Sequence, residues 1–480
     1  MSRKRWRPSH RAGVPLIRRR SGDECSAMNR SRGAIGALLA CLLVAGCGSG
    51  STGAPPQTTA PPPTGPPTPT AAPATAQGSV APSVSVSPLP ASPTVAEIAD
   101  LRSRVSANPD DAGALRDLGL ALLQRVRETA DPSLYAQAEE ALGRAHQLDP
   151  EDPLVEVGIG GLQLGRHEFK QALETGRTVL KLLPDLPAAR AIEVDALIEL
   201  GRYADADKAA ARLLTLRPDI VSLPRVSYLR ELHGDIKGAI EAMRAAAQSP
   251  GLAPENIAYV TTLLGSLLVR AGDLTGADAA YRRALDLVPN HAPAIAGLGR
   301  LAIGRGDLAD ATADFRRASD ILPLPEYVIA LGETGQLAGD SAGSAASYGL
   351  ARAEIRLFES AGVAVDLELA LFEADHGDPQ RALELADAAY ARAPTVRAAD
   401  ARAWALHRLG RNVEARATED EALRLGSKDP LLRFHSGAIS AALGDSRTAR
   451  RDLTMSLEAD AGFSPTGADE ARRIIASLTH

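Results

Sequence analysis

The dominant feature of the chain is a helical spacing of apolar residues that runs from about Ala96 to the C-terminus. Leucine, alanine, valine and isoleucine recur three and four residues apart throughout this region. No segment alternates strictly between apolar and polar positions, as a half-buried strand would. Glycine or proline interrupts the spacing at regular intervals, so the pattern predicts an all-α region built from many short helices.

One longer pattern recurs within this region. It consists of a glycine, an alanine five residues later, a second alanine seven residues further on and a proline five residues after that. Gly272, Ala277, Ala284 and Pro289 fit it. It recurs in residues 306–323, 377–394 and, with Leu213 in place of the second alanine, 201–218. The glycines that mark successive repeats are 33 to 38 residues apart, at positions 201, 234, 272, 306, 339, 377, 410 and 444.

Each position of the pattern has a physical role in a pair of helices. The glycine ends the first helix, where a left-handed backbone is needed. The residue after it begins the second helix, and an aspartate there, such as Asp273 or Asp307, can cap that helix. The two alanines permit close approach of the paired helices, and the proline stops the second one.

The period and the residue placement resemble the tetratricopeptide repeat (TPR) family over roughly residues 97–460. The resemblance implies an all-α, right-handed superhelical solenoid of about ten helix pairs. One pair cannot bury its own apolar face, so the pairs must stack, and residues 467–478 are expected to form a capping helix. We therefore expect residues 96–480 to fold as a single solenoid.

Several pairs depart from the pattern. The turn of the first pair is enlarged, over about residues 126–133, and Gly165 comes two residues early in the second. Pro224 falls inside the fourth pair, which also lacks the usual first-helix residues. The second helix of the seventh pair runs on through Phe358, and the ninth pair ends at Gly426 instead of a proline. These departures affect the local register and leave the expected architecture unchanged.

The N-terminal region carries features of an export signal. Residues 28–46 contain two arginines followed by a short apolar run, which indicates a signal peptide. Residues 43–47, Leu-Val-Ala-Gly-Cys, resemble the bacterial lipobox, and that resemblance implies diacylglyceryl transfer to Cys47. Residues 1–27 are interpreted as an upstream extension, with Met28 the true start. Residues 47–95 hold many prolines and no charge, so we expect the lipidated cysteine to be followed by a disordered tether.

Charge and cysteine content narrow the possible functions. A chain beginning at Cys47 has 43 basic and 57 acidic residues, a net charge of −14. Such a chain has no electrostatic reason to bind nucleic acid. No cysteine follows residue 47, and the histidines lack metal-ligand spacing, so we expect no metal site and no cofactor.

Two short motifs resemble catalytic patterns, but one lies on a helix turn and the other lacks a required residue. Residues 339–343, Gly-Asp-Ser-Ala-Gly, match hydrolase motifs around Ser341, yet they fall on the turn of a helix pair, whereas such a serine needs strands around it. Residues 167–171, His-Glu-Phe-Lys-Gln, begin like a zinc-protease helix but have Gln171 where the second histidine must be. We expect no catalytic residue, no small-molecule substrate and no enzymatic activity.

The resemblance implies a scaffold that binds proteins or peptides in the groove lined by the first helices. With the lipid signal, this predicts a protein anchored to the outer face of the cell membrane of a bacterium; the Arg and Ala bias favours a GC-rich genome. An alternative is a dedicated accessory or regulatory subunit of one cell-envelope complex, for cell-wall synthesis, secretion or transport. A remote alternative is an enzyme with an unrecognised site.

The positions that face the groove in TPR proteins can be carried over by counting back from each turn glycine. Trp404 is the only tryptophan after the signal region, and it either lines the groove wall or packs against the next pair. The full set of groove candidates is Tyr259, Thr262, Ser266, Arg300, Glu333, Gln336, Arg397, Asp400, Trp404, His407 and Phe434.

Overall fold

The computed structural model describes residues 93–249 and 254–478, and within these ranges all regular secondary structure is helical. The predictions for residues 1–27, 28–46 and Cys47, and nearly all of the predicted tether, lie outside the described residues. The helices are α1 (Pro93–Ala107), α2 (Ala112–Thr129), α3 (Leu134–Leu148), α4 (Pro153–Gly165), α5 (Phe169–Leu182), α6 (Pro187–Glu199), α7 (Tyr203–Leu216), α8 (Leu223–Leu232), α9 (Ile236–Ala247), α10 (Pro254–Arg270), α11 (Leu274–Leu287), α12 (Ala292–Arg305), α13 (Leu308–Ile321), α14 (Pro325–Leu337), α15 (Ser341–Ser360), α16 (Asp366–His376), α17 (Pro379–Arg392), α18 (Val396–Arg408), α19 (Asn412–Ala422), α20 (Pro430–Ala442), α21 (Ser446–Ala459) and α22 (Pro465–Ser477).

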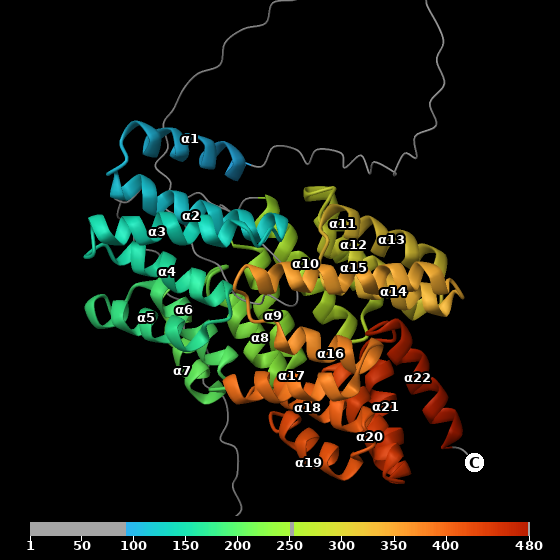
Figure 1. The fold of residues 1–480 in the computed structure, drawn as a ribbon. Coiled ribbons are helices and arrows are strands. Elements are labelled where there is room, and N and C mark those ends of the chain that lie inside the picture. The colour runs from blue at the N-terminus through green and yellow to red at the C-terminus, as the bar shows by residue number, and fades with distance from the viewer. Residues whose placement is uncertain (1–92, 250–253, 479–480) are drawn as a thin grey trace, which may run out of the picture.

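Successive helices pack side by side and form a TPR-like solenoid, which confirms the all-α prediction (Figure 1). The recurring small residues allow this close packing. Ala277 and Ala284 on α11 are fully buried. A Cβ atom added to Gly297 on α12 would lie only 2.5 Å from the Tyr281 ring, so a glycine there lets the two helices meet over that ring.

The turn glycines and the aspartate caps also form largely as the sequence predicts. Seven of the eight turn glycines have a positive φ, from 69° to 80°. Asp273 and Asp307 accept hydrogen bonds from backbone N–H groups in the first turns of α11 and α13, at 2.9 and 3.2 Å. Local sequence therefore determines where most pairs turn.

The prediction of a left-handed glycine is wrong at Gly377, whose φ is −144°. Pro379 begins α17, and a residue before proline is restricted to extended backbone, which Asp378 adopts. In the second pair His167 takes the left-handed conformation, with a φ of 61°. A non-glycine residue is uncommon in this conformation, so other contacts must hold His167 there.

The remaining departures alter single elements. Pro224 lies in the first turn of α8, where proline is tolerated, and α15 continues through Phe358 to Ser360. The solenoid is preceded by α1, which begins three residues before the predicted boundary at 96. The C-terminal helix α22 begins at Pro465, two residues earlier than expected.

The second half of the chain folds back onto the first half, which the sequence pattern did not predict (Figure 1). We call the line of contacts between the halves the seam. Ala364 donates a backbone hydrogen bond to the carbonyl of Arg166 at 3.3 Å, and the Ala364 carbonyl lies 2.7 Å from Nδ1 of His167. Val396 N donates to the Tyr203 hydroxyl at 3.0 Å. The seam joins residues that are almost 200 positions apart.

Further along the seam, two turn glycines meet the backbone of the other half. A Cβ atom on Gly201 would lie 2.5 Å from the Pro394 carbonyl oxygen, and one on Gly234 would lie 2.5 Å from that of Gly426. Gly201 therefore needs to be glycine for two reasons, its positive φ and this close approach.

None of the described helices is both long and apolar enough to cross a lipid bilayer.

Candidate binding cavity

A central cavity of about 460 Å³ lies between the two halves of the chain. Its walls come mainly from the first helices of successive pairs, namely α8, α10, α12, α14, α16, α18 and α20. Asp460 and residues 462–464, which link α21 to α22, complete the wall together with Pro465 at the start of α22. Its size is typical of a ligand pocket.

Six of the eleven groove candidates line this cavity. Tyr259 and Ser266 come from α10, Arg300 from α12 and Glu333 from α14. Arg397 and Asp400 come from α18. Counting from the turn glycines therefore selects residues from both halves of the chain that face one common space.

The other five candidates do not line the cavity. Thr262 is buried, and its hydroxyl donates to the Ala258 carbonyl at 2.9 Å within α10. Gln336 is exposed and accepts a hydrogen bond from the Tyr348 hydroxyl at 3.1 Å. The remaining three, Trp404, His407 and Phe434, form one aromatic cluster in the C-terminal core.

Trp404 packs in the core, as the second of its two expected placements has it. Its side chain is 0% exposed, and its ring stacks on that of His435 at 4.1 Å between centroids. The indole N–H donates to Asp375 Oδ1 at 2.8 Å, and Asp375 itself lines the cavity. Trp404 therefore does not line the cavity but contacts its wall through Asp375.

Two arginines of the cavity wall have no direct partner. Within the described residues, the side chains of Arg300 and Arg397 make neither a hydrogen bond nor an ion pair. Burial opposes the charge of Arg397, but Tyr228 and the carboxylates of Glu199 and Glu368 outweigh it and raise the pKa of Arg397. Each guanidinium can therefore offer several N–H donors to a ligand.

Carboxylates share the cavity with these arginines. Burial raises the pKa of Glu326, and the positive charges of Arg300 and Arg397 partly offset this effect. Burial likewise raises the pKa of Asp460 at the edge of the cavity. The interior thus presents guanidinium donors beside carboxyl groups, which suits a ligand that carries donors and acceptors along its length, as a peptide backbone does.

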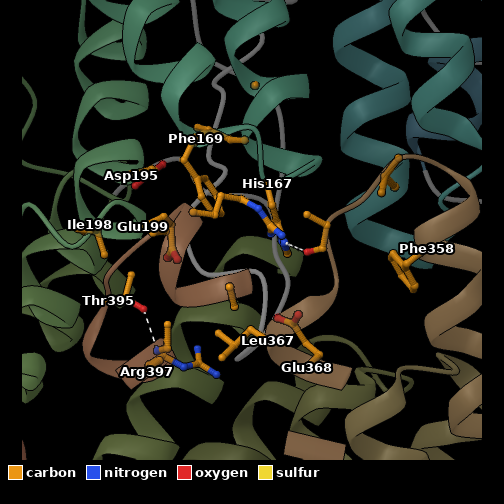
Figure 2. A pocket seen from close by; sticks show the side chains of 18 of the residues that line it. His167, Phe169, Asp195, Ile198, Glu199, Phe358, Leu367, Glu368, Thr395 and Arg397 are labelled. Atoms are coloured by element: carbon orange, nitrogen blue, oxygen red, sulfur yellow. Dashed lines mark hydrogen bonds between the residues drawn. The ribbon is translucent and has the colours of Figure 1, made fainter. Parts of the chain in front are cut away.

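A smaller cavity of about 100 Å³ adjoins the central one, and both are lined by Arg127, Tyr228, Glu368 and Arg397. Figure 2 shows His167 and Phe169 on one side of this space and Glu368 and Arg397 on another. The repeat pattern did not select Arg127, His167 or Glu368 as site residues. The enlarged turn over about residues 126–133 and the early Gly165 signalled only that these turns differ from those of the other pairs.

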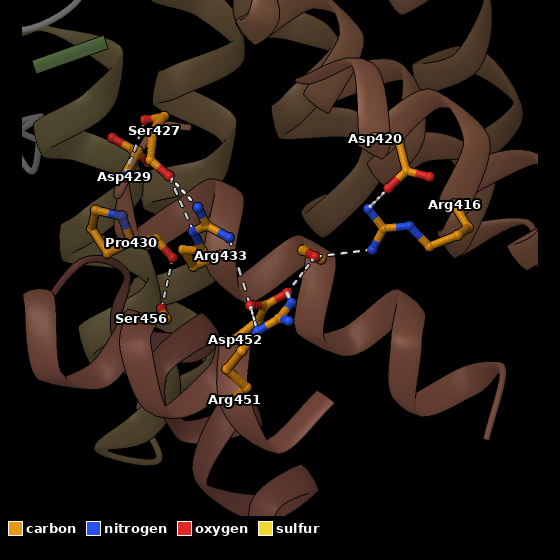
Figure 3. Close-up of polar contacts among 10 residues, drawn as sticks. Arg416, Asp420, Ser427, Asp429, Pro430, Arg433, Arg451, Asp452 and Ser456 are labelled. Atoms are coloured by element: carbon orange, nitrogen blue, oxygen red, sulfur yellow. Dashed lines mark hydrogen bonds and ion pairs between the residues drawn. The ribbon is translucent and has the colours of Figure 1, made fainter. Parts of the chain in front are cut away.

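A polar network holds the C-terminal pairs that form one wall of the cavity (Figure 3). Asp452 is completely buried and accepts a hydrogen bond from the Ser436 hydroxyl at 2.8 Å. It also forms ion pairs with Arg433 and Arg451. A buried carboxylate with several donors is stable only when all of them are in place, so this network fixes α20 against α21.

Comparisons with known proteins identify tetratricopeptide repeats in the chain. A tetratricopeptide repeat family model matches residues 262–323 and 367–430. Cellulose synthase operon protein C of Pseudomonas fluorescens is 26% identical over 183 residues, which cover 36% of this chain and 14% of that protein. A TPR repeat-containing protein of Pseudomonas aeruginosa is 31% identical over 86 residues, 18% of this chain and 14% of that protein. The matches thus span about one seventh of the length of each of these relatives.

Among solved structures, the APC/C hetero-tetramer Cut9–Hcn1 is similar at 13% identity with a TM-score of 0.41, covering 80% of this chain and 82% of that one. The repeated helix pairs, their turn glycines and the family match lead to one conclusion. This chain carries tetratricopeptide repeats, in residues 262–323 and 367–430, within an all-α solenoid.

Proposed function

We propose that this protein is a membrane-anchored, extracytoplasmic TPR scaffold that binds a peptide segment of a partner protein in its central cavity. The observation that carries the proposal is the convergence of first-helix residues from both halves of the chain on one cavity of about 460 Å³. The unpartnered guanidinium groups of Arg300 and Arg397 would donate hydrogen bonds to carbonyl or carboxylate oxygens of the bound segment. The anchor is the lipid expected on Cys47.

The proposal is tested by cross-linking in intact cells that express the full chain. The double variant Arg300→Gln and Arg397→Gln should reduce the yield of the cross-linked partner about tenfold, because buried arginines often dominate binding energy. Arg282→Gln is the matched control, since Arg282 is exposed on α11 and pairs with Asp278 of the same helix. Equal yields from the double variant and the wild type, both folded, would refute binding in the cavity.

A second candidate function is a dedicated subunit of one cell-envelope complex. It is favoured by the partial similarity to cellulose synthase operon protein C. A dedicated subunit should migrate with its complex at fixed stoichiometry in native gels of solubilised membranes. A scaffold with several partners should instead appear in several species of different size.

A further inference from the structure

The loop of residues 460–464 contacts the backbone of α12. A Cβ atom added to Gly462 would lie 2.1 Å from the carbonyl oxygen of Arg300 and 3.2 Å from the backbone nitrogen of Gly304. Real Cβ contacts are never this short, so only glycine permits this approach. The loop therefore lies directly against the helix that presents Arg300 to the cavity.

The same loop is attached to α14 by a side-chain hydrogen bond. Ser464 Oγ donates to Glu333 Oε2 at 2.9 Å, and it accepts the N–H of Gly467 at 3.0 Å as the cap of α22. The other oxygen of Glu333 lies 3.0 Å from Nε2 of His376. Ser464 thus links the first turn of α22 to Glu333 on α14, one of the groove candidates.

The helix that follows the loop continues along the same surface. α22 packs beside α14 (Figure 1). Phe463 contacts the ring of Phe434 at 5.4 Å between centroids. Residues of this loop also form part of the cavity wall. The C-terminal segment of the chain therefore occupies part of the face that α12 and α14 would offer to a bound peptide.

We infer that residues 460–464 and α22 form an autoinhibitory strap, which closes one side of the cavity and must move away before a partner can bind across α12 and α14. This inference rests on the proposed function for the identity of the cavity as the binding site. The strap is held by the backbone contact at Gly462, the hydrogen bond at Ser464 and the ring contact of Phe463. α22 adds an ion pair between Glu470 and Arg408 at 4.0 Å and the packing of its fully buried Ala471. Such a segment can open locally while the rest of the fold persists.

The test is the substitution Gly462→Ala in the full chain, read by cavity access and by hydrogen exchange. A Ser266→Cys background supplies a thiol on the cavity wall, since Ser266 is half-buried and lines the cavity. Peptide mass spectrometry distinguishes labelling at residue 266 from labelling of the native cysteines at 25, 41 and 47. We expect Gly462→Ala to raise the labelling rate of residue 266 about tenfold and to remove exchange protection from α22, while α10 and α11 remain protected.

Gly349→Ala is the matched control, because a Cβ atom there meets no other atom within 4 Å. Ser464→Ala is a milder second variant for use if Gly462→Ala does not fold, and it should raise labelling by a smaller factor. Unchanged labelling at residue 266 in a folded variant, with or without loss of protection in α22, would overturn the inference. Both measurements need no partner, so they separate failure of the strap from failure of the proposed function.

Discussion

Trp404 and Arg397 are two helical turns apart on α18, yet they have opposite environments. Arg397 lines the cavity and makes no hydrogen bond or ion pair with the described residues, whereas Trp404 is fully buried against Phe434 and His435. Their spacing of seven residues places both on one helix face, so the sequence could predict the face but not the depth of burial. Burial at Trp404 depends on where α20 packs, which periodicity does not specify.

We expect Trp404→Ala to lower the free energy of unfolding by about 3–5 kcal/mol, because it removes a fully buried ring and leaves a cavity. It also leaves Asp375 without the indole donor at 2.8 Å. Chemical denaturation followed by circular dichroism measures the change.

Trp404→Phe is the control, since it keeps most of the ring and loses the N–H group. A smaller loss of stability in this variant would attribute most of the effect to packing. A Trp404→Ala protein as stable as the wild type would contradict the core placement.

At the scale of single elements, the sequence was most informative about turns and caps. A glycine followed by aspartate marks both the end of one helix and the cap of the next, because both features are local. The exceptions have local causes that compete with this rule. Pro379 prevents the usual turn at Gly377, and His167 replaces glycine where contacts with the other half of the chain hold it.

Asp307→Ala tests the cap of α13. Losing the bond to the Asp310 N–H should cost about 1 kcal/mol, which makes amide exchange in the first turn of α13 about fivefold faster. Hydrogen exchange with mass spectrometry measures it. Asp320→Ala, near the other end of the same helix, should leave that turn unchanged, and equal effects of the two changes would argue against a specific cap.

At the scale of the whole molecule, the sequence predicted the repeats but not the closure between the two halves. The seam contacts, such as that between His167 and Ala364, join repeats that are far apart in the chain, and the repeat pattern does not specify which distant repeats meet. The counting rule still selected six cavity residues, because the first helices point the same face inward whether the array is open or closed. It missed Asp460 and Gly462, which lie in a loop outside the pattern.

Cys47→Ser tests the anchor on which the proposed localisation depends. The variant should lose labelling with a fatty-acid analogue and leave the membrane fraction, because stable anchoring needs the acyl chains. Cys41→Ser is the control, and we expect it to keep both labelling and membrane association. Persistent labelling of Cys47→Ser would rule out this cysteine as the modified residue.

The seam also determines how the chain should fold. An array with contacts only between neighbouring repeats can unravel from either end in small steps. Here, contacts such as that between Tyr203 and Val396 close loops of almost 200 residues, and long closures form slowly and late. Refolding should therefore show a fast phase, in which the helix pairs form and stack, followed by a slow phase in which the two halves join.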